Sequence, residues 1–162
     1  MNITHSDLIT HAAKWLSSRC AVVITDMTHA GSETPDAIGW SSRASILIEC
    51  KASRADFLAD RQKSFRRVPN QGMGAYRYFC TPAGLIKAGE LPEGWGLLEY
   101  TEGKKSLKMA AGSRCFKEHA RSIEIGLLVS ALRRVGQVCP AGVSVKCYTM
   151  ETKNRATLGV AA

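Results

Sequence analysis

Residues 44–51 carry the sequence Ala-Ser-Ile-Leu-Ile-Glu-Cys-Lys, and this stretch decides how the rest of the chain is interpreted. It is almost continuously apolar until Glu49, and a strand that is apolar on both faces is typical of the centre of a sheet covered by helices. Side chains alternate along a strand, so Glu49 and Lys51 point to the same side. We therefore expect a central strand whose last residues bring a carboxylate and an ammonium group together.

The segments on either side of this strand predict one mixed α/β domain. Apolar periodicity, capping residues and turn residues indicate helices over about 6–18 (N-cap Ser6), 53–67 (N-cap Ser53) and 117–135, with a short helix from Pro82. Strands are expected over 20–25, 35–40, 76–81, 97–100, 106–109 and 143–150. The chain of 162 residues suits a single domain over 1–162, with a core at about 6–110 and a C-terminal helix and tail at 111–162.

Composition narrows the classes of function. The net charge of +8 favours polyanionic partners, although solubility alone also explains such an excess. The chain has no apolar run of about 20 residues, the length that a membrane span needs, and it has no signal-peptide pattern at its start, so we expect a cytoplasmic protein. The six cysteines form no Cys-x-x-Cys pair, which favours reduced structural thiols over a zinc site or a disulfide framework.

Asp36 is expected to join Glu49 and Lys51. A turn at 41–43 would fold the strand that follows Asp36 back beside residues 44–51. Clustered carboxylates need a cation, and Mg²⁺ accepts one or two of them while keeping several waters. The Cys50 carbonyl is a third candidate ligand. Lys51 would then orient a metal-bound water, assist its deprotonation or stabilise charge on a phosphate; the alternative is an ordinary Glu49–Lys51 salt bridge.

This pattern resembles a known family. Pro35-Asp36 followed by Glu49-Cys50-Lys51 is similar to the signature of the PD-(D/E)XK nuclease superfamily. The run from Ile48 to Arg61 resembles the MmcB-like DNA-repair group of that superfamily, and the likeness covers about residues 8–82. It implies a central mixed β-sheet flanked by helices with a restriction-endonuclease-like core in the order αβββαβ. It also implies Mg²⁺, with Mn²⁺ able to substitute.

By position, the resemblance implies that Asp36, Glu49 and Lys51 are catalytic and that the metal is held by Asp36 and Glu49. A further acidic residue would be Asp26, favoured by strand register, or Glu33. Two residues on the following helix, Gln62 and Asp60, are candidates to support the site. Four arginines are candidates for contacts with nucleic acid, although exposure to solvent explains basic helices equally well: Arg54, Arg61, Arg66 and Arg67.

We therefore predict a Mg²⁺-dependent nuclease that hydrolyses DNA phosphodiester bonds through a metal-activated water. The alternative is a nucleic-acid-binding or regulatory module that keeps the nuclease fold without cutting. The sequence leaves open RNA, single-stranded DNA or branched DNA as the substrate, endonuclease or exonuclease action, and a homodimer formed through the C-terminal helix. A face shared by Asp56, Asp60, Lys63 and Arg67 is expected to be solvated and ion-paired.

Overall fold

The fold is an open six-stranded mixed sheet with helices on both faces. A computed structural model describes residues 3–27, 33–104 and 106–135. The helices are α1 (His5–Ser17), α2 (Arg54–Asp60), α3 (Ser64–Arg67) and α4 (Arg121–Val135), with short 3-10 turns at Pro69–Gln71 and Ala88–Glu90. The strands are β1 (Val22–Thr25), β2 (Ala37–Trp40), β3 (Ser45–Cys50), β4 (Tyr76–Pro82), β5 (Gly96–Tyr100) and β6 (Lys108–Ala111).

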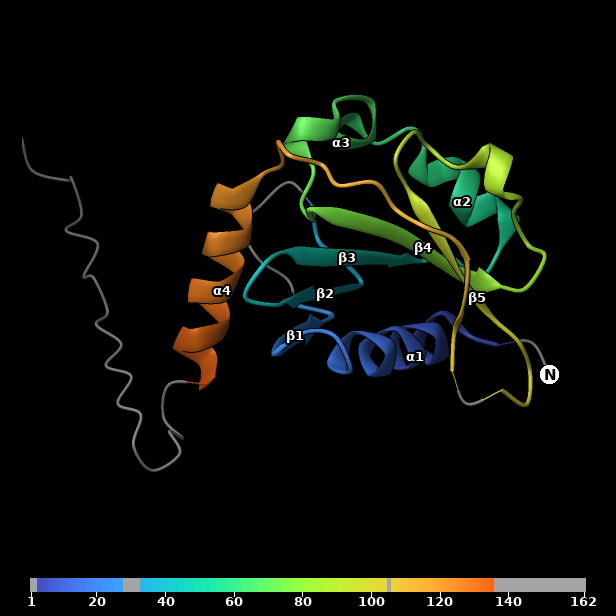
Figure 1. Cartoon of the computed structure of the whole chain (residues 1–162), viewed down its shortest axis with the longest axis horizontal. Helices are drawn as coiled ribbons and strands as arrows, with labels where there is room; N and C mark the ends of the chain where they lie inside the picture. Colours follow the sequence, from blue (N-terminus) through green and yellow to red (C-terminus); the bar gives the residue numbers. More distant parts are fainter. Residues whose placement is uncertain (1–2, 28–32, 105, 136–162) are drawn as a thin grey trace, which may run out of the picture.

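The strands lie in the sheet in the order in which they occur along the chain. β1, β2 and β3 form an antiparallel meander, β3, β4 and β5 run parallel, and β6 closes the far edge in antiparallel orientation. The parallel step from β3 to β4 requires a crossover, which α2 and α3 supply (Figure 1). The predicted mixed sheet and the predicted order αβββαβ are confirmed.

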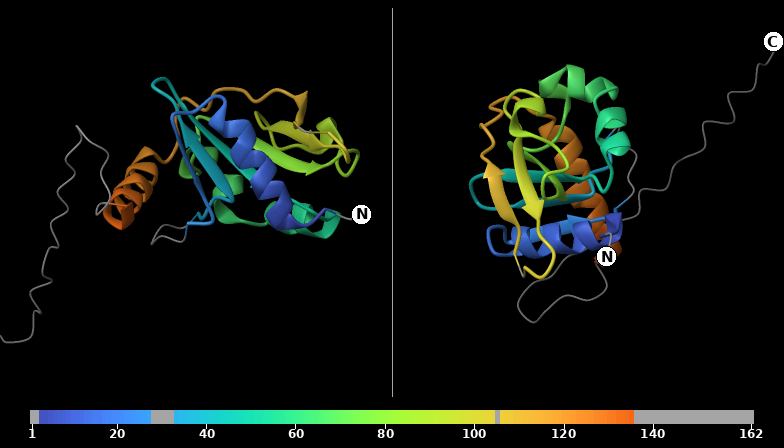
Figure 2. Two further views of the ribbon diagram at one scale, coloured as in Figure 1. Left: turned by 90° about the horizontal axis from the view of Figure 1, so that it is seen from below. Right: turned by 90° about the vertical axis from the view of Figure 1, so that its right-hand side faces the viewer.

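Two apolar layers hold the helices on the sheet. On one face α1 contributes Leu8, Ala12 and Leu16 to a cluster that includes Ile48 and Cys50 of β3. On the other face Leu47 packs in a second cluster with Phe57 of α2, Phe79 of β4 and Leu127 of α4. Figure 2 shows α1 alone beneath the sheet and α2 and α3 above it. The central strand is thus apolar on both sides because each side faces a helical layer.

Several expected boundaries were wrong. α1 begins one residue earlier than expected, and its N-cap is Thr4 rather than Ser6, because Thr4 and Asp7 form a reciprocal capping box. Ser53 does cap α2, but α2 ends at Asp60, and a turn precedes α3. Leu58 of α2 is 46% exposed.

The second half departs further from expectation. The segment after Pro82 forms a turn and a short 3-10 helix instead of an α-helix, and the last helix starts at Arg121 rather than at residue 117. Within that helix Leu127 is buried, whereas Leu132 is 51% exposed. The expected strand at 143–150 lies outside the described residues.

Three of the four cysteines that the structure describes lie in the core. Cys20, Cys50 and Cys80 are buried free thiols, and Cys115 is an exposed one. Burial raises the pKa of Cys20, and the neighbouring Cys80 thiol together with burial raises that of Cys50. Both thiols therefore stay protonated and pack as small hydrophobic groups.

Candidate active site

The carboxyl end of β3 gathers the residues that the sequence singled out. The antiparallel register pairs Ala37 with Ile48, so the next pair along places Asp36 opposite Glu49. The Asp36 carboxylate accepts a hydrogen bond of 2.7 Å from the Cys50 amide, and His5 at the start of α1 lies 3.3 Å from its other oxygen. The turn at Ser41–Ala44 that folds β2 back onto β3 therefore brings Asp36 to Glu49.

Glu49 and Lys51 form a buried ion pair on the side of β3 that faces α2 and α3. The distance from Lys51 Nζ to Glu49 Oε2 is 3.1 Å, and the two side chains are 8% and 2% exposed. Burial raises the pKa of Glu49, and repulsion from the Asp36 and Asp60 carboxylates raises it further. Arg66 and Lys51 lower this pKa, but the net shift is upward. The three carboxylates are therefore close enough to repel one another.

The ammonium group of Lys51 is held charged by this acidic surrounding. Its Nζ also lies 3.2 Å from Asp60 Oδ1. Burial alone lowers the pKa of Lys51, but the attraction of Glu49, Asp60 and Asp36 outweighs burial, and the net shift is upward. Lys51 is consequently a cation at neutral pH and has no free lone pair with which to take a proton.

Arg66 of α3 crosses the cluster and binds three carboxylates at once. Its Nε lies 2.6 Å from Asp60 Oδ2, its Nη1 2.7 Å from Glu33 Oε1 and its Nη2 3.1 Å from Glu49 Oε1. The guanidinium also stacks 4.5 Å from the ring centre of Trp95. Its side chain is 3% exposed, and these carboxylates raise the pKa of Arg66 despite burial. Arg66 is thus an internal counter-ion.

Asp60, at the end of α2, is the most strongly paired acid of the cluster. Lys63 Nζ approaches Asp60 Oδ1 to 2.7 Å, in addition to Lys51 and Arg66. Burial would raise the pKa of Asp60, but Arg66, Lys63 and Lys51 lower it to about 2. The expected solvated helix face is wrong for this residue, because the turn after α2 brings α3 back over the sheet and encloses Asp60.

The cluster offers Mg²⁺ a small set of oxygen donors. Among the residues that the structure describes, no group of three His, Cys, Asp or Glu side chains is arranged to hold a metal ion. Mg²⁺ needs only one or two carboxylates beside its waters, and Asp36 and Glu49 supply that number. Glu49 Oε1 is buried 3.1 Å from Arg66 Nη2 and accepts no hydrogen bond within the described residues, whereas Asp60 Oδ1 already contacts Lys63 at 2.7 Å and Lys51 at 3.2 Å. The donor set fits a metal held by a carboxylate pair.

Asp26, the further acidic residue favoured by strand register, lies beside Asp36, because its backbone amide donates a hydrogen bond of 3.3 Å to the Asp36 carbonyl oxygen. Asp26 is exposed and adopts a left-handed backbone conformation with φ of 49° just after β1. Glu33, the other candidate, is 1% exposed and accepts both from Arg66 and from the Met73 amide at 2.6 Å. Gln62 is exposed at the turn between α2 and α3, so of the two predicted supporting residues only Asp60 joins the cluster.

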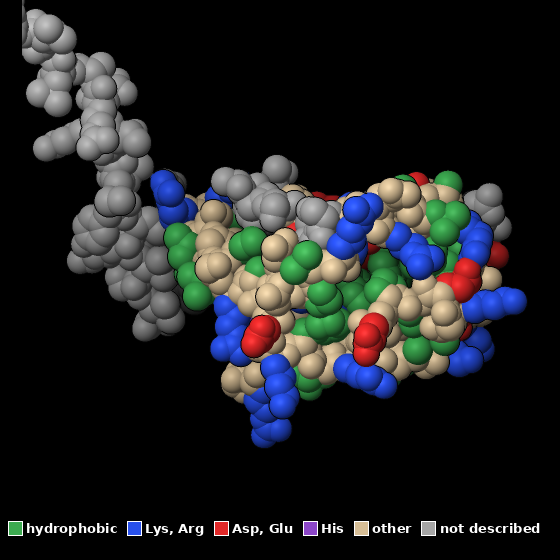
Figure 3. All heavy atoms as spheres, turned by 90° about the horizontal axis from the view of Figure 1, so that it is seen from above, with side chains coloured by type: hydrophobic (Ala, Val, Ile, Leu, Met, Phe, Trp, Pro, Cys, Tyr) green, Lys and Arg blue, Asp and Glu red, His purple; other side chains and the backbone are tan. Residues whose placement is uncertain are grey.

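The four arginines predicted to contact nucleic acid separate into different environments. Arg61 and Arg67 are exposed, and Arg54 is exposed but forms a two-pronged ion pair with Glu90. Arg66 is enclosed among carboxylates, so it is not part of the surface. Figure 3 shows Lys and Arg side chains around the margin of one face, with hydrophobic side chains between them.

Sequence reasoning missed three contributors to the site. His5 beside Asp36, Arg66 among the carboxylates and Trp95 beneath Arg66 come from separate segments of the chain. The Asp60–Arg66 spacing of six does not place two residues on one face of a continuous helix, so only the break between α2 and α3 brings them together.

Comparison with known proteins bears on the fold. No known protein family matches this sequence, and no curated protein matches it. The structure of SPO1766, a protein of unknown function from Silicibacter pomeroyi, superposes with a TM-score of 0.62 at 20% sequence identity. The match covers 83% of this chain and 91% of that chain. It supports the α/β architecture with a six-stranded mixed sheet flanked by helices, and at this identity it extends to the fold alone.

Among the described residues, no helix combines the length and the apolar character required to span a membrane.

Proposed function

We propose that this protein is a metal-dependent nuclease that hydrolyses DNA phosphodiester bonds, related to the PD-(D/E)XK superfamily and to its MmcB-like DNA-repair group. The observation that carries the proposal is the meeting of Asp36, Glu49 and Lys51 at the carboxyl end of β3. A buried carboxylate whose pKa is raised, as that of Glu49 is, beside a charged lysine is more typical of a functional site than of ordinary packing.

In this proposal Asp36 and Glu49 hold Mg²⁺, with the Cys50 carbonyl as the predicted third ligand. The ion would lower the pKa of a bound water and polarise the phosphate. Lys51 stabilises negative charge that develops on the phosphate, because its raised pKa keeps it protonated. Of the three roles considered for Lys51, this electrostatic role therefore fits better than removal of a proton from water.

Cleavage of supercoiled plasmid and of labelled oligonucleotides, with Mg²⁺, Mn²⁺ or EDTA, tests the proposal. Glu49→Gln and Lys51→Met remove the two charges while keeping side-chain size, and Glu99→Gln and Lys104→Met serve as matched controls outside the cluster. We expect metal-dependent cleavage that falls at least about 100-fold in the first pair, as on removal of one transition-state contact. The control pair should retain the wild-type rate. Wild-type cleavage by folded Glu49→Gln or Lys51→Met would overturn the assigned roles.

A second candidate function is a DNA-binding or regulatory module that does not cut. One observation favours it: Lys51 and Arg66 already supply cations to Glu49. A cluster neutralised in this way is also a stable structural element without a metal ion. DNA binding in the cleavage buffer with no product in Mg²⁺ or Mn²⁺ would decide for this module.

A cytoplasmic location accompanies both candidate functions. The free thiols at Cys20, Cys50 and Cys80 suit a reducing compartment. Fractionation of cells that express the protein tests this assignment.

A further inference from the structure

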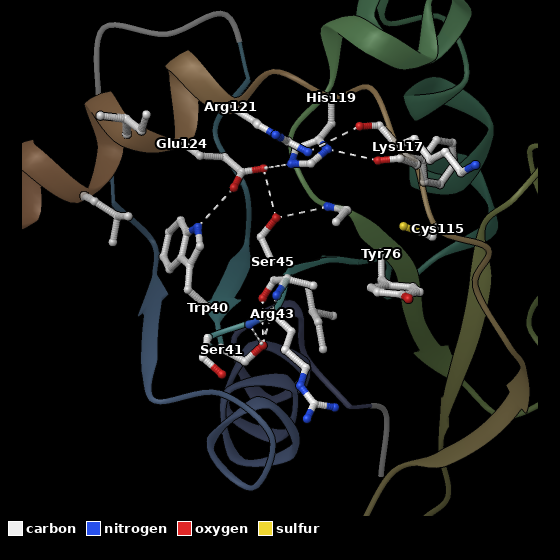
Figure 4. Close-up of a pocket in the computed structure, with 17 residues that line it drawn as sticks. Trp40, Ser41, Arg43, Ser45, Tyr76, Cys115, Lys117, His119, Arg121 and Glu124 are labelled. Carbon is white, nitrogen blue, oxygen red and sulfur yellow. Dashed lines mark hydrogen bonds and ion pairs between the residues drawn. The ribbon is translucent and has the colours of Figure 1, made fainter.

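A pocket lies at the opposite end of β3 from Glu49 and Lys51. It is bounded by the turn between β2 and β3, by the start of β4 and by the segment that leads into α4 (Figure 4). Its volume is about 720 Å³. Pockets that hold small organic ligands typically measure about 300–1,000 Å³. The pocket is therefore large enough for one nucleotide.

Three cationic residues surround this pocket. Arg43 lies on the turn before β3, while Lys117 and Arg121 lie on the segment that enters α4 (Figure 4). All three are exposed, and within the described part of the chain none of them forms an ion pair with a carboxylate. Cations that have no carboxylate partner around one pocket favour an anionic ligand.

Glu124, the acidic residue of the pocket wall, forms hydrogen bonds within the fold. Glu124 is 4% exposed. Its Oε1 accepts from the Gly74 amide at 2.7 Å and from Ser45 Oγ at 3.1 Å, and its Oε2 accepts from Trp40 Nε1 at 3.0 Å. His119 adds a contact of 3.6 Å. Glu124 thus organises the wall, and the three cations at the rim outnumber its single negative charge.

The same pocket presents an aromatic ring and an apolar wall. Tyr76 at the start of β4 lines it together with Ile46 and Leu128. Tyr76 lies against the exposed thiol of Cys115, which raises the pKa of its phenol. Proteins that bind single-stranded nucleic acid combine aromatic rings with cations, because the bases stack on the rings while the cations neutralise the phosphates.

We propose that this pocket binds an unpaired nucleotide of the DNA substrate, with its base against Tyr76 and with its own and the neighbouring phosphates near Arg43, Lys117 and Arg121. This inference rests on the proposed function, in that DNA is the substrate. It adds that the preferred DNA contains single-stranded nucleotides, since a base within a duplex cannot enter an aromatic pocket.

The distance along β3 between the pocket and the candidate active site allows one DNA strand to contact both. Ser45 and Glu49 are four residues apart on one strand, which corresponds to about 13 Å. That distance equals about four stacked nucleotide steps at roughly 3.4 Å each.

Binding measured without metal tests the cationic rim separately from cleavage. Fluorescence anisotropy of labelled oligothymidylate in EDTA would compare wild type with the triple variant Arg43→Ala/Lys117→Ala/Arg121→Ala. A control triple variant removes the same charge from exposed residues elsewhere: Lys87, Lys104 and Lys108, each to Ala. We expect affinity to fall at least about tenfold in the first triple only, with the salt slope smaller by about 2 for three lost phosphate contacts. Equal losses in both triples, or none in the first, would overturn the proposal.

Tyr76→Leu and Tyr76→Phe test the base contact. Tyr76→Phe keeps the ring and should retain the wild-type affinity, whereas Tyr76→Leu should bind oligothymidylate several-fold more weakly. Equal affinity of the two variants would remove the stacking role. Because Tyr76 also packs partly against the core, urea denaturation accompanies the binding measurement.

Cys115 provides a direct report from inside the pocket. Its alkylation by N-ethylmaleimide, followed by peptide mass spectrometry in EDTA, should slow when oligothymidylate is bound. Paired duplex of the same sequence should give little protection, and inorganic tripolyphosphate should protect only at much higher concentration. Full reactivity of Cys115 in the presence of bound oligothymidylate would refute the assignment, as would equal protection by the duplex or by tripolyphosphate.

These outcomes are separable from those of the cleavage assay. If oligothymidylate protects Cys115 but the protein never cuts DNA, the pocket assignment stands and the nuclease proposal is refuted. Metal-dependent cleavage by a protein whose Cys115 stays fully reactive would do the reverse.

Discussion

Replacing Arg66 with glutamine removes the central counter-ion of the carboxylate cluster. Arg66 contacts Glu33, Glu49 and Asp60 at 2.6–3.1 Å with a side chain that is 3% exposed. Glutamine is uncharged and ends where the Nε of arginine lies, so it reaches neither Glu33 nor Glu49 as the Nη atoms do. Of the cations around the three buried carboxylates, Lys51 and Lys63 would remain. An uncompensated buried charge is among the most unfavourable changes that a core can undergo.

The expected loss of stability is large. Removing one partner of a buried ion pair costs about 3–5 kcal/mol. The stacking of the guanidinium on Trp95, at 4.5 Å, contributes about 1 kcal/mol or more when desolvated. Typical domains have only about 5–15 kcal/mol of total stability, so Arg66→Gln should remove a substantial fraction of it.

Urea denaturation at neutral pH, followed by circular dichroism, measures this loss. Arg67→Gln is the matched control. Arg67 follows Arg66 in the chain but is exposed, so replacing Arg67 should change the free energy of unfolding by less than about 0.5 kcal/mol. The difference between Arg66→Gln and wild type should shrink on acidification, since the stranded carboxylates then take up protons. An Arg66→Gln protein as stable as Arg67→Gln at neutral pH would show that Arg66 is not the counter-ion of the cluster.

Three further predictions concern individual residues. The pKa of Asp60 is lowered to about 2, so the stabilisation that its charge provides is complete above about pH 4 and is lost as the pH falls through 2. When the free energy of unfolding is measured by urea denaturation as the pH is lowered, wild type should lose about 2 kcal/mol more than Asp60→Asn. Gly96→Ala should lower the stability of the fold by about 1–3 kcal/mol in thermal melts, because the added Cβ would lie 2.4 Å from the ring of Tyr78. At Gly126 in α4 an added Cβ meets no atom within 4 Å, so Gly126→Ala should raise the stability by up to about 1 kcal/mol. Thr4→Ala should cost about 1 kcal/mol through loss of the capping box, and unchanged stability would argue against the cap.

The elements that sequence predicts well are those whose pattern depends on local physics. The apolar run of β3 requires cover on both faces whatever packs there, and α1 and the α2 layer provide it. The turn residues Ser41 and Ala44 fix the return from β2 to β3, and this return places Asp36 opposite Glu49. Because each signal lies within a few residues of its consequence, the core order and the Asp36–Glu49 proximity follow from sequence.

The remaining features depend on contacts between distant segments. Nothing local to Arg66 distinguishes it from the exposed Arg67, since its burial arises from a helix break at residues 61–63 and from Glu33 on another segment. Glu124 likewise reads as a surface residue of a helix until Trp40 and Ser45 are placed beside it. A buried polar network is defined by its partners, and a single sequence gives no record of which partners meet.

One loop joins the candidate active site to the nucleotide pocket. The backbone amides of Met73, Gly74 and Ala75 are held in turn by Glu33, Glu124 and Ser45. The first of these side chains belongs to the carboxylate cluster and the other two to the pocket wall, so the same three peptide groups fix both regions.

The preceding residues of this loop are clamped as well. The guanidinium of Arg77, 1% exposed, donates to the carbonyl oxygens of Pro69, Gly72 and Gly74, and burial lowers its pKa to about 10. Because consecutive peptide groups cannot shift independently, a displacement that breaks the contact of Glu33 with Met73 also strains the contact of Glu124 with Gly74. The rigidity of this loop is therefore the physical basis on which a nucleotide bound in the pocket would keep a fixed register relative to Glu49 and Lys51.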